Sequence, residues 1–100
     1  MIVNYQTTNI NTPAIVSAAT ALASNPKRLG WTIQNLGTNT LFVLLGSGAS
    51  STVFHTVLKA GTGNDDGTGG SVGQESGVVY TGIITISGSS PRYTVTEMAP

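Results

Sequence analysis

Apolar and polar residues alternate in short runs along this chain, and Gly, Pro, Asn or Ser separates one run from the next. The first run is MIVNYQTT, at residues 1–8. A later run, RLGWTIQNL at 28–36, places Leu29, Trp31 and Ile33 on one face of an extended strand. Short alternating runs rich in β-branched and aromatic residues are typical of β-strands with one buried face. The pattern predicts a strand in each segment.

The run TLFVLL, at residues 40–45, is apolar throughout, which predicts a strand buried on both faces. Only the turn residues Gly37-Thr38-Asn39 separate it from the strand at 28–36, so the two are expected to form a hairpin. Further strands are predicted for the runs at 51–59, 78–87 and 92–97.

Two positions in this pattern are less regular. The alanines of residues 14–24 and a start at Thr12-Pro13 favour a helix, whereas Val16 and Thr20 favour a strand. Because the neighbouring segments are all predicted strands, we expect residues 14–24 to be extended. Gly82 interrupts the run at 78–87 and predicts a bulge or a close backbone approach.

About seven short strands without a confident helix predict an all-β fold, a single antiparallel β-sandwich that is jelly-roll-like. A chain of 100 residues is expected to form one domain, residues 1–100, with a Gly-rich acidic loop at 60–77. The alternation places these side chains in or near the core: Trp31, Ile33, Leu41, Val43, Phe54, Leu58, Ile84 and Val95.

Charged residues make up only 8% of the chain, and four basic residues balance four acidic ones. No electrostatic field therefore favours nucleic acid or an anionic membrane, and no apolar run is long enough to span a bilayer. Net charge near zero promotes association, so we expect contacts with other proteins and a homo-oligomer. A monomer kept soluble by hydroxyl and amide groups is the alternative.

The Gly-rich segment invites three nucleotide or metal hypotheses. A phosphate-binding loop needs a lysine after its last glycine, and no lysine follows Lys59. A dinucleotide fingerprint needs glycine where Asp66 stands. A calcium loop alternates its ligands, whereas Asp65 and Asp66 are adjacent and Asp-Gly is a common turn. We expect no cofactor and no metal.

Catalytic candidates are equally weak. Gly69-Gly70-Ser71-Val72-Gly73 matches the nucleophile pattern G-x-S-x-G, which works only at a strand-to-helix turn of a longer fold. His55 lies on an alternating run and is expected to be half-buried or at an interface. The chain has no cysteine and no plausible pair of carboxylates, so we expect no enzyme activity.

A resemblance extends over roughly residues 14–97. It rests on the turn NPKR at 25–28, the strand end IQN at 33–35, the turn GTN at 37–39, the apolar run LFV at 41–43, and VLKAG at 57–61, before a last strand that ends at Glu97. In these motifs the chain resembles small all-β structural proteins of tailed bacteriophages. The long acidic Gly-rich insertion departs from the shorter members of that group.

The resemblance implies a virion protein without catalytic residues. A capsid decoration (cement) protein that binds the major capsid protein or other virion proteins is expected, with a trimer favoured because capsid lattices offer three-fold sites. The alternative is a tail, adaptor or fibre component, or a carbohydrate-binding adhesin module. Arg28 is expected to organise its turn by reaching Asn35 or a carbonyl, and Asn35 to cap a turn.

Glycine's conformational freedom suggests that the loop is an extended arm that becomes ordered on a neighbouring subunit. The residues expected to form this assembly loop are Gly63, Asn64, Asp65, Asp66, Gly67 and Glu75.

Overall fold

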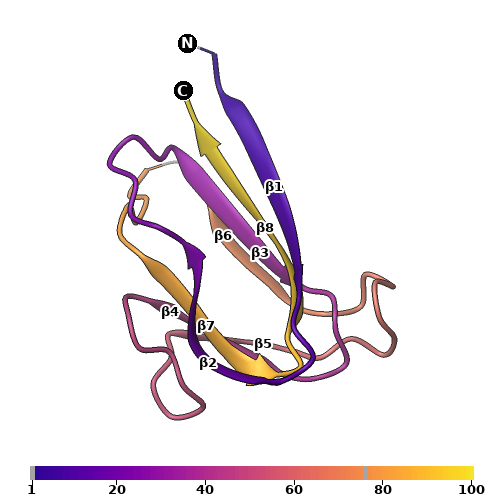
Figure 1. Ribbon diagram of the computed structural model, residues 1–100. Coiled ribbons are helices and arrows are strands. Elements are labelled where there is room, and N and C mark those ends of the chain that lie inside the picture. Colours follow the sequence, from indigo (N-terminus) through magenta and orange to yellow (C-terminus); the bar gives the residue numbers. More distant parts are fainter. Residues whose placement is uncertain (1, 76) are drawn as a thin grey trace.

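The computed structural model describes residues 2–75 and 77–100, which form eight β-strands in two four-stranded layers (Figure 1). One sheet has the order β1-β8-β3-β6 and the other the order β2-β7-β4-β5. The strands are β1 (Asn4–Asn11), β2 (Ile15–Leu22), β3 (Gly30–Asn35), β4 (Leu41–Leu45), β5 (Thr56–Leu58), β6 (Ser71–Gln74), β7 (Ile84–Ser89) and β8 (Arg92–Ala99).

The pairing follows the pattern of a long hairpin folded over on itself. β1 pairs with β8, β2 with β7, β3 with β6 and β4 with β5, and all these pairs are antiparallel. Folding this ribbon brings β3 beside β8 and β4 beside β7, which closes the two sheets. This is the eight-stranded jelly-roll arrangement. The predicted all-β antiparallel sandwich is confirmed, with eight strands in place of about seven.

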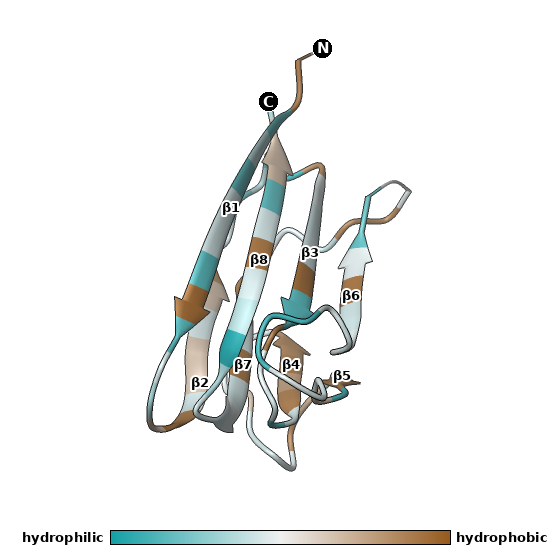
Figure 2. Cartoon of the chain, turned by 90° about the vertical axis from the view of Figure 1, so that its right-hand side faces the viewer, coloured by the Kyte–Doolittle hydropathy of each residue, from teal (hydrophilic) through white to brown (hydrophobic). Residues whose placement is uncertain are grey.

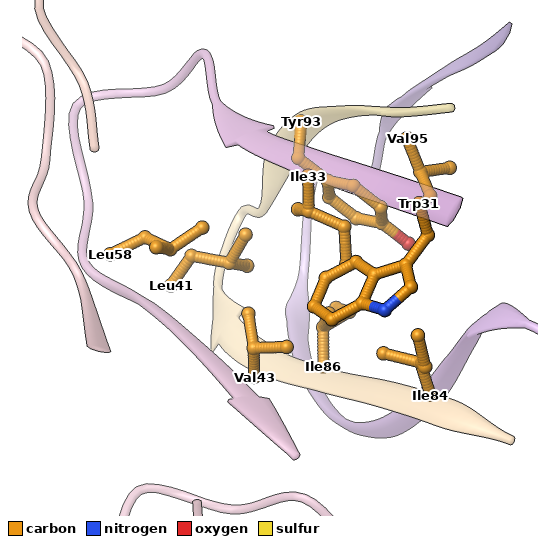
Figure 3. Packing of buried hydrophobic residues seen from close by; sticks show 9 residues of the cluster. All are labelled: Trp31, Ile33, Leu41, Val43, Leu58, Ile84, Ile86, Tyr93 and Val95. Atoms are coloured by element: carbon orange, nitrogen blue, oxygen red, sulfur yellow. The ribbon is translucent and has the colours of Figure 1, made fainter. Parts of the chain in front are cut away.

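The core lies between the two sheets, where alternate residues of the central strands meet (Figure 3). Trp31 and Ile33 of β3 face Val43 of β4 and Ile86 of β7. Figure 2 shows β4 as mainly hydrophobic and β1 as mainly hydrophilic, in agreement with their central and edge positions. The buried cluster consists of Trp31, Ile33, Leu41, Val43, Leu58, Ile84, Ile86, Tyr93 and Val95.

Two sequence-based expectations about this core are wrong. The segments at 28–36 and 40–45 do not form a hairpin, because β3 and β4 lie in opposite sheets and the chain crosses between them. The crossing lets the apolar faces of both strands meet, whereas a hairpin would set them side by side. Phe54 is 42% exposed, since β5 begins only at Thr56 and Phe54 precedes it in a loop.

The two irregular segments, residues 14–24 and the region of Gly82, are both extended or lie next to a strand. β2 covers most of residues 14–24, as expected, with two register shifts against β7 and a positive φ at Ala18. β7 begins at Ile84, so Gly82 precedes the strand and does not interrupt it. A Cβ at Gly82 would collide with the Tyr80 side chain, so the close approach here is made by a side chain and not by another backbone segment. In β4, Leu41 and Val43 are buried and the other side chains are half-buried.

Candidate functional site

Arg28 is buried and binds four separate acceptors. Its Nε donates to Glu97 Oε2 at 2.8 Å, and Nη1 donates to the carbonyls of Tyr80 and Gly82 at 3.0 and 2.9 Å. Nη2 donates to the carbonyl of Ala23 at 2.6 Å. The guanidinium thereby joins the turn after β2, the approach to β7 and the end of β8. The expectation that Arg28 reaches a carbonyl is confirmed, and its partners do not include Asn35.

Asn35 is buried at the end of β3 and caps the turn that follows. Its Oδ1 accepts a hydrogen bond from the Gly37 N–H at 3.0 Å, and its Nδ2 donates to the Asn39 carbonyl at 2.8 Å. Nδ2 also lies 3.3 Å from the carbonyls of Leu58 and Lys59, just after β5. The side-chain cap expected from the sequence is confirmed, and it also connects the two sheets.

Two aspartates organise the loop between β5 and β6. Asp66 accepts hydrogen bonds from the Thr62 hydroxyl at 2.8 Å, the Thr68 hydroxyl at 2.6 Å and the Thr68 N–H at 3.0 Å. Asp65 forms a bidentate ion pair with Arg92 of β8, in which Nε lies 2.8 Å from Oδ1. Hydrogen bonds from Arg92 lower the pKa of Asp65, and those from Thr68 and Thr62 lower the pKa of Asp66.

The expectation of an extended arm at 60–77 is wrong for the residues that the structure describes. The Gly61 and Asp65 N–H groups donate to the carbonyls of Gly37 and Leu36, which fixes the loop on its own domain. Residues 71–74 then form β6, an edge strand paired with β3. A Cβ at Gly69 would collide with the Asn35 carbonyl oxygen, so glycine here permits close packing.

The predicted assembly-loop residues do not gather in one place. Gly63, Asn64 and Gly67 lie with the two aspartates in the compact turn, where Gly67 has a φ of 81°. Glu75 lies beyond β6 and lines a pocket together with Val3, Tyr5 and Met98. Ser76, within the same segment, lies outside the described residues. An assembly role for these residues remains a proposal.

The other candidate residues of the sequence analysis lie at exposed positions. Ser71 of the G-x-S-x-G match lies on the exposed edge strand β6, and His55 is exposed ahead of β5. In residues 2–75 and 77–100 no three His, Cys, Asp or Glu side chains are grouped so that they could hold a metal ion. Over the same ranges, no helix is long and apolar enough to cross a membrane.

The surface carries several large apolar side chains, and one of them, Phe54, was predicted to lie in or near the core. Phe54 packs against Phe42 on the outside of the sheet, with ring centroids 5.1 Å apart. The sequence VFHTV at 53–57 places apolar residues on both faces of an extended segment. This was the available sequence signal that apolar side chains also lie on the outer surface. The exposed large apolar residues are Ile2, Val3, Tyr5, Ile15, Val53, Phe54, Val57 and Val78.

Comparison with known proteins found no matching family model, no matching curated protein and no matching solved structure.

Proposed function

We propose that this chain is a non-catalytic structural protein of a bacteriophage virion that stabilises the capsid shell through protein–protein contacts. The observation that carries the proposal is the surface. Two of the four cationic side chains, Arg28 and Arg92, already form ion pairs with Glu97 and Asp65 of the same chain. The remaining surface is rich in hydroxyl and amide groups, with large apolar side chains among them. Surfaces of this kind are suited to broad, neutral contacts.

The fold adds support at the level of architecture alone. Jelly rolls occur in viral shell proteins and in lectins, so the arrangement is compatible with a virion protein without specifying one. The partners proposed are the major capsid protein or other virion proteins, together with further copies of this chain. A position on a tail, adaptor or fibre is the alternative within the same class.

Reconstitution tests the proposal. Purified protein is added to particles that lack it, and binding is measured by sedimentation while shell stability is measured by thermal release of the genome. We expect saturable binding that changes little with salt, because charge contributes little to the contact. Binding that disappears at moderate salt, or binding without any effect on shell stability, would contradict the proposed role.

A carbohydrate-binding module is a second candidate, favoured by one observation. Phe42 lines a groove of about 420 Å³ together with Asn39, Ser87 and Ser89, a mixture of aromatic and hydroxyl groups that suits sugars. A glycan array screened with the purified domain and with Phe54→Ala, which removes the ring packed on Phe42, separates the two functions. Specific glycan binding by the wild type that is lost in the variant would favour the sugar-binding role.

A further inference from the structure

β1 is the most exposed strand of the fold, at the edge of its sheet (Figure 1). Every side chain from Asn4 to Asn11 is exposed except Ile10, which is half-buried. Within residues 2–75 and 77–100, no strand pairs with its outer edge. Tyr5 is 67% exposed, and the chain before it adds the exposed apolar residues Ile2 and Val3.

The outer edge of β1 presents a regular row of backbone donors and acceptors. β1 pairs with β8 without a register shift, and the Thr12 N–H donates to the Pro91 carbonyl in continuation of the ladder. In an antiparallel ladder, alternate residues bond to the same neighbour. The even-numbered residues of β1 therefore bond to β8, and the backbone groups of Tyr5, Thr7, Asn9 and Asn11 point away from the molecule.

The other three edge strands do not offer such a row. β2 is interrupted by two register shifts, and the Ala18 N–H already donates to the Ala49 carbonyl. β5 has three residues and β6 has four. Edge strands are usually protected from pairing by charge, proline, bulges or shortness. β1, with the sequence NYQTTNIN, has none of these protections.

We propose that β1 of a second copy of this chain occupies this edge, antiparallel, about a two-fold axis that passes beside Thr8. In this register Tyr5 lies opposite Asn11 of the second copy, and Thr7 lies opposite Asn9. All four residues that direct backbone groups outward then gain partners. The two sheets join into one, and their outer faces, which carry Thr7, Thr96 and Thr32, become continuous.

A second copy fits this edge better than a foreign strand does. Charge complementarity would select a foreign strand, and β1 carries no charge with which to do so. The same neutrality means that self-pairing brings no like charges together. Two-fold pairing is also the commonest symmetry of homo-oligomers. It differs from the trimer expected from the sequence, and it does not rest on the proposed virion role.

A proline variant tests the pairing. Thr7→Pro removes an N–H that points away from β8, so the internal ladder is kept, and a two-fold pair loses that donor on each side. Thr7→Val, which keeps the N–H, is the matched control. By sedimentation equilibrium we expect a dimer for the wild type and the control, and a dissociation constant about tenfold or more higher for Thr7→Pro. A wild-type monomer at all concentrations, or a trimer, would overturn the proposal.

Single cysteines test the register and do not depend on the proline variant being folded. The chain has no cysteine, so Thr8→Cys introduces one thiol beside the axis. The two Cα atoms would then lie about 4.5 Å apart in a non-hydrogen-bonded pair, within disulfide range. Gln6→Cys is the control, because it lies on the same face but about 13 Å from its equivalent. We expect an oxidised dimer for Thr8→Cys only. Equal yields for both variants, or none for Thr8→Cys, would overturn the pairing.

Discussion

Single polar side chains inside the fold connect segments that are distant in sequence. Arg28 joins the turn after β2, the approach to β7 and the end of β8. Asn35 joins the turn after β3 to the chain after β5. Over residues 2–75 and 77–100, every buried side-chain nitrogen or oxygen has a hydrogen-bond partner. A buried polar group without a partner destabilises the folded state. These side chains therefore specify how the two sheets meet, and removing one lowers the stability of the fold.

Removing the Arg28 side chain is expected to destabilise the fold strongly. Arg28→Ala removes the charged partner of the Glu97 carboxylate and the donor of three carbonyls in a part-buried site, and we expect the free energy of unfolding to fall by about 3 kcal/mol. Urea denaturation measures the change. Lys27→Ala, an exposed neighbour, is the control and should change stability by about 0.5 kcal/mol or less. Equal effects for the two variants would show that Arg28 is not a structural anchor.

The Asp66 carboxylate is expected to give the loop a stability that depends on pH. Its pKa is lowered from 3.8 because Thr68 and Thr62 hydrogen-bond to the ionised form. A lowered pKa means that the contribution is present above pH 3.8 and is lost as pH falls through the lowered value. At pH 7, Asp66→Asn should therefore have a lower melting temperature than the wild type, and this difference should disappear in strong acid.

Thermal melts at several pH values measure this difference. Asn64→Ala, a neighbouring substitution that removes no titrating group, should shift the melting temperature equally at all pH values. A difference between Asp66→Asn and the wild type that stays constant from neutral pH to strong acid would contradict the assigned role of the carboxylate.

At the scale of elements, local patterns predicted strands well and their partners poorly. Alternation in the segments of β3 and β8 identified Trp31, Ile33 and Val95 as core residues, because a strand with one buried face has a period of two. The same alternation carries no information on which strand lies beside it. The predicted hairpin of β3 and β4 failed for that reason, since the turn after Asn35 was identified but not its crossing to the other sheet.

The candidate site was predictable in part. Arg28 and Asn35 were identified as turn organisers, but the acceptors of Arg28 at Tyr80 and Gly82 are distant in sequence and leave no local pattern. In residues 60–77 a high glycine content suggested an extended arm. The glycines instead permit the close approach of β6 to β3, where Trp31 Nε1 donates to Gln74 Oε1 at 2.9 Å.

Because residues 71–74 form β6, a deletion that includes them is expected to have a larger effect than a deletion in the rest of the loop. Replacing residues 61–77 by a short turn removes β6 and the Gln74 partner of Trp31, so the variant is expected to unfold or to lose most of its stability. Excising only residues 62–68 removes exposed contacts, including the Asp65–Arg92 ion pair, and should cost about 1 kcal/mol or less. Circular dichroism melts of the two variants measure this contrast. Two variants of equal stability would show that β6 does not contribute to the core.

At the scale of the molecule, charged side chains are scarce, and those of Arg28, Glu97, Arg92 and Asp65 form ion pairs within the chain. The two ion pairs tie β8 to the turn after β2 and to the loop before β6. The outer faces are left with hydroxyl and amide groups, exposed apolar side chains and one long unprotected edge strand. Such a surface is expected to promote association, and it supports the proposed contacts with other proteins.

The copy number of this chain in purified particles tests the proposed structural role most directly. Quantitative mass spectrometry measures it as a ratio to the major shell protein, with a known low-copy tail protein as the internal reference. The proposed shell role predicts a ratio of the same order as the shell subunits or their local symmetry sites. A copy number as low as that of the tail reference would place the protein on the tail or neck, and its absence from the particle would contradict the virion role altogether.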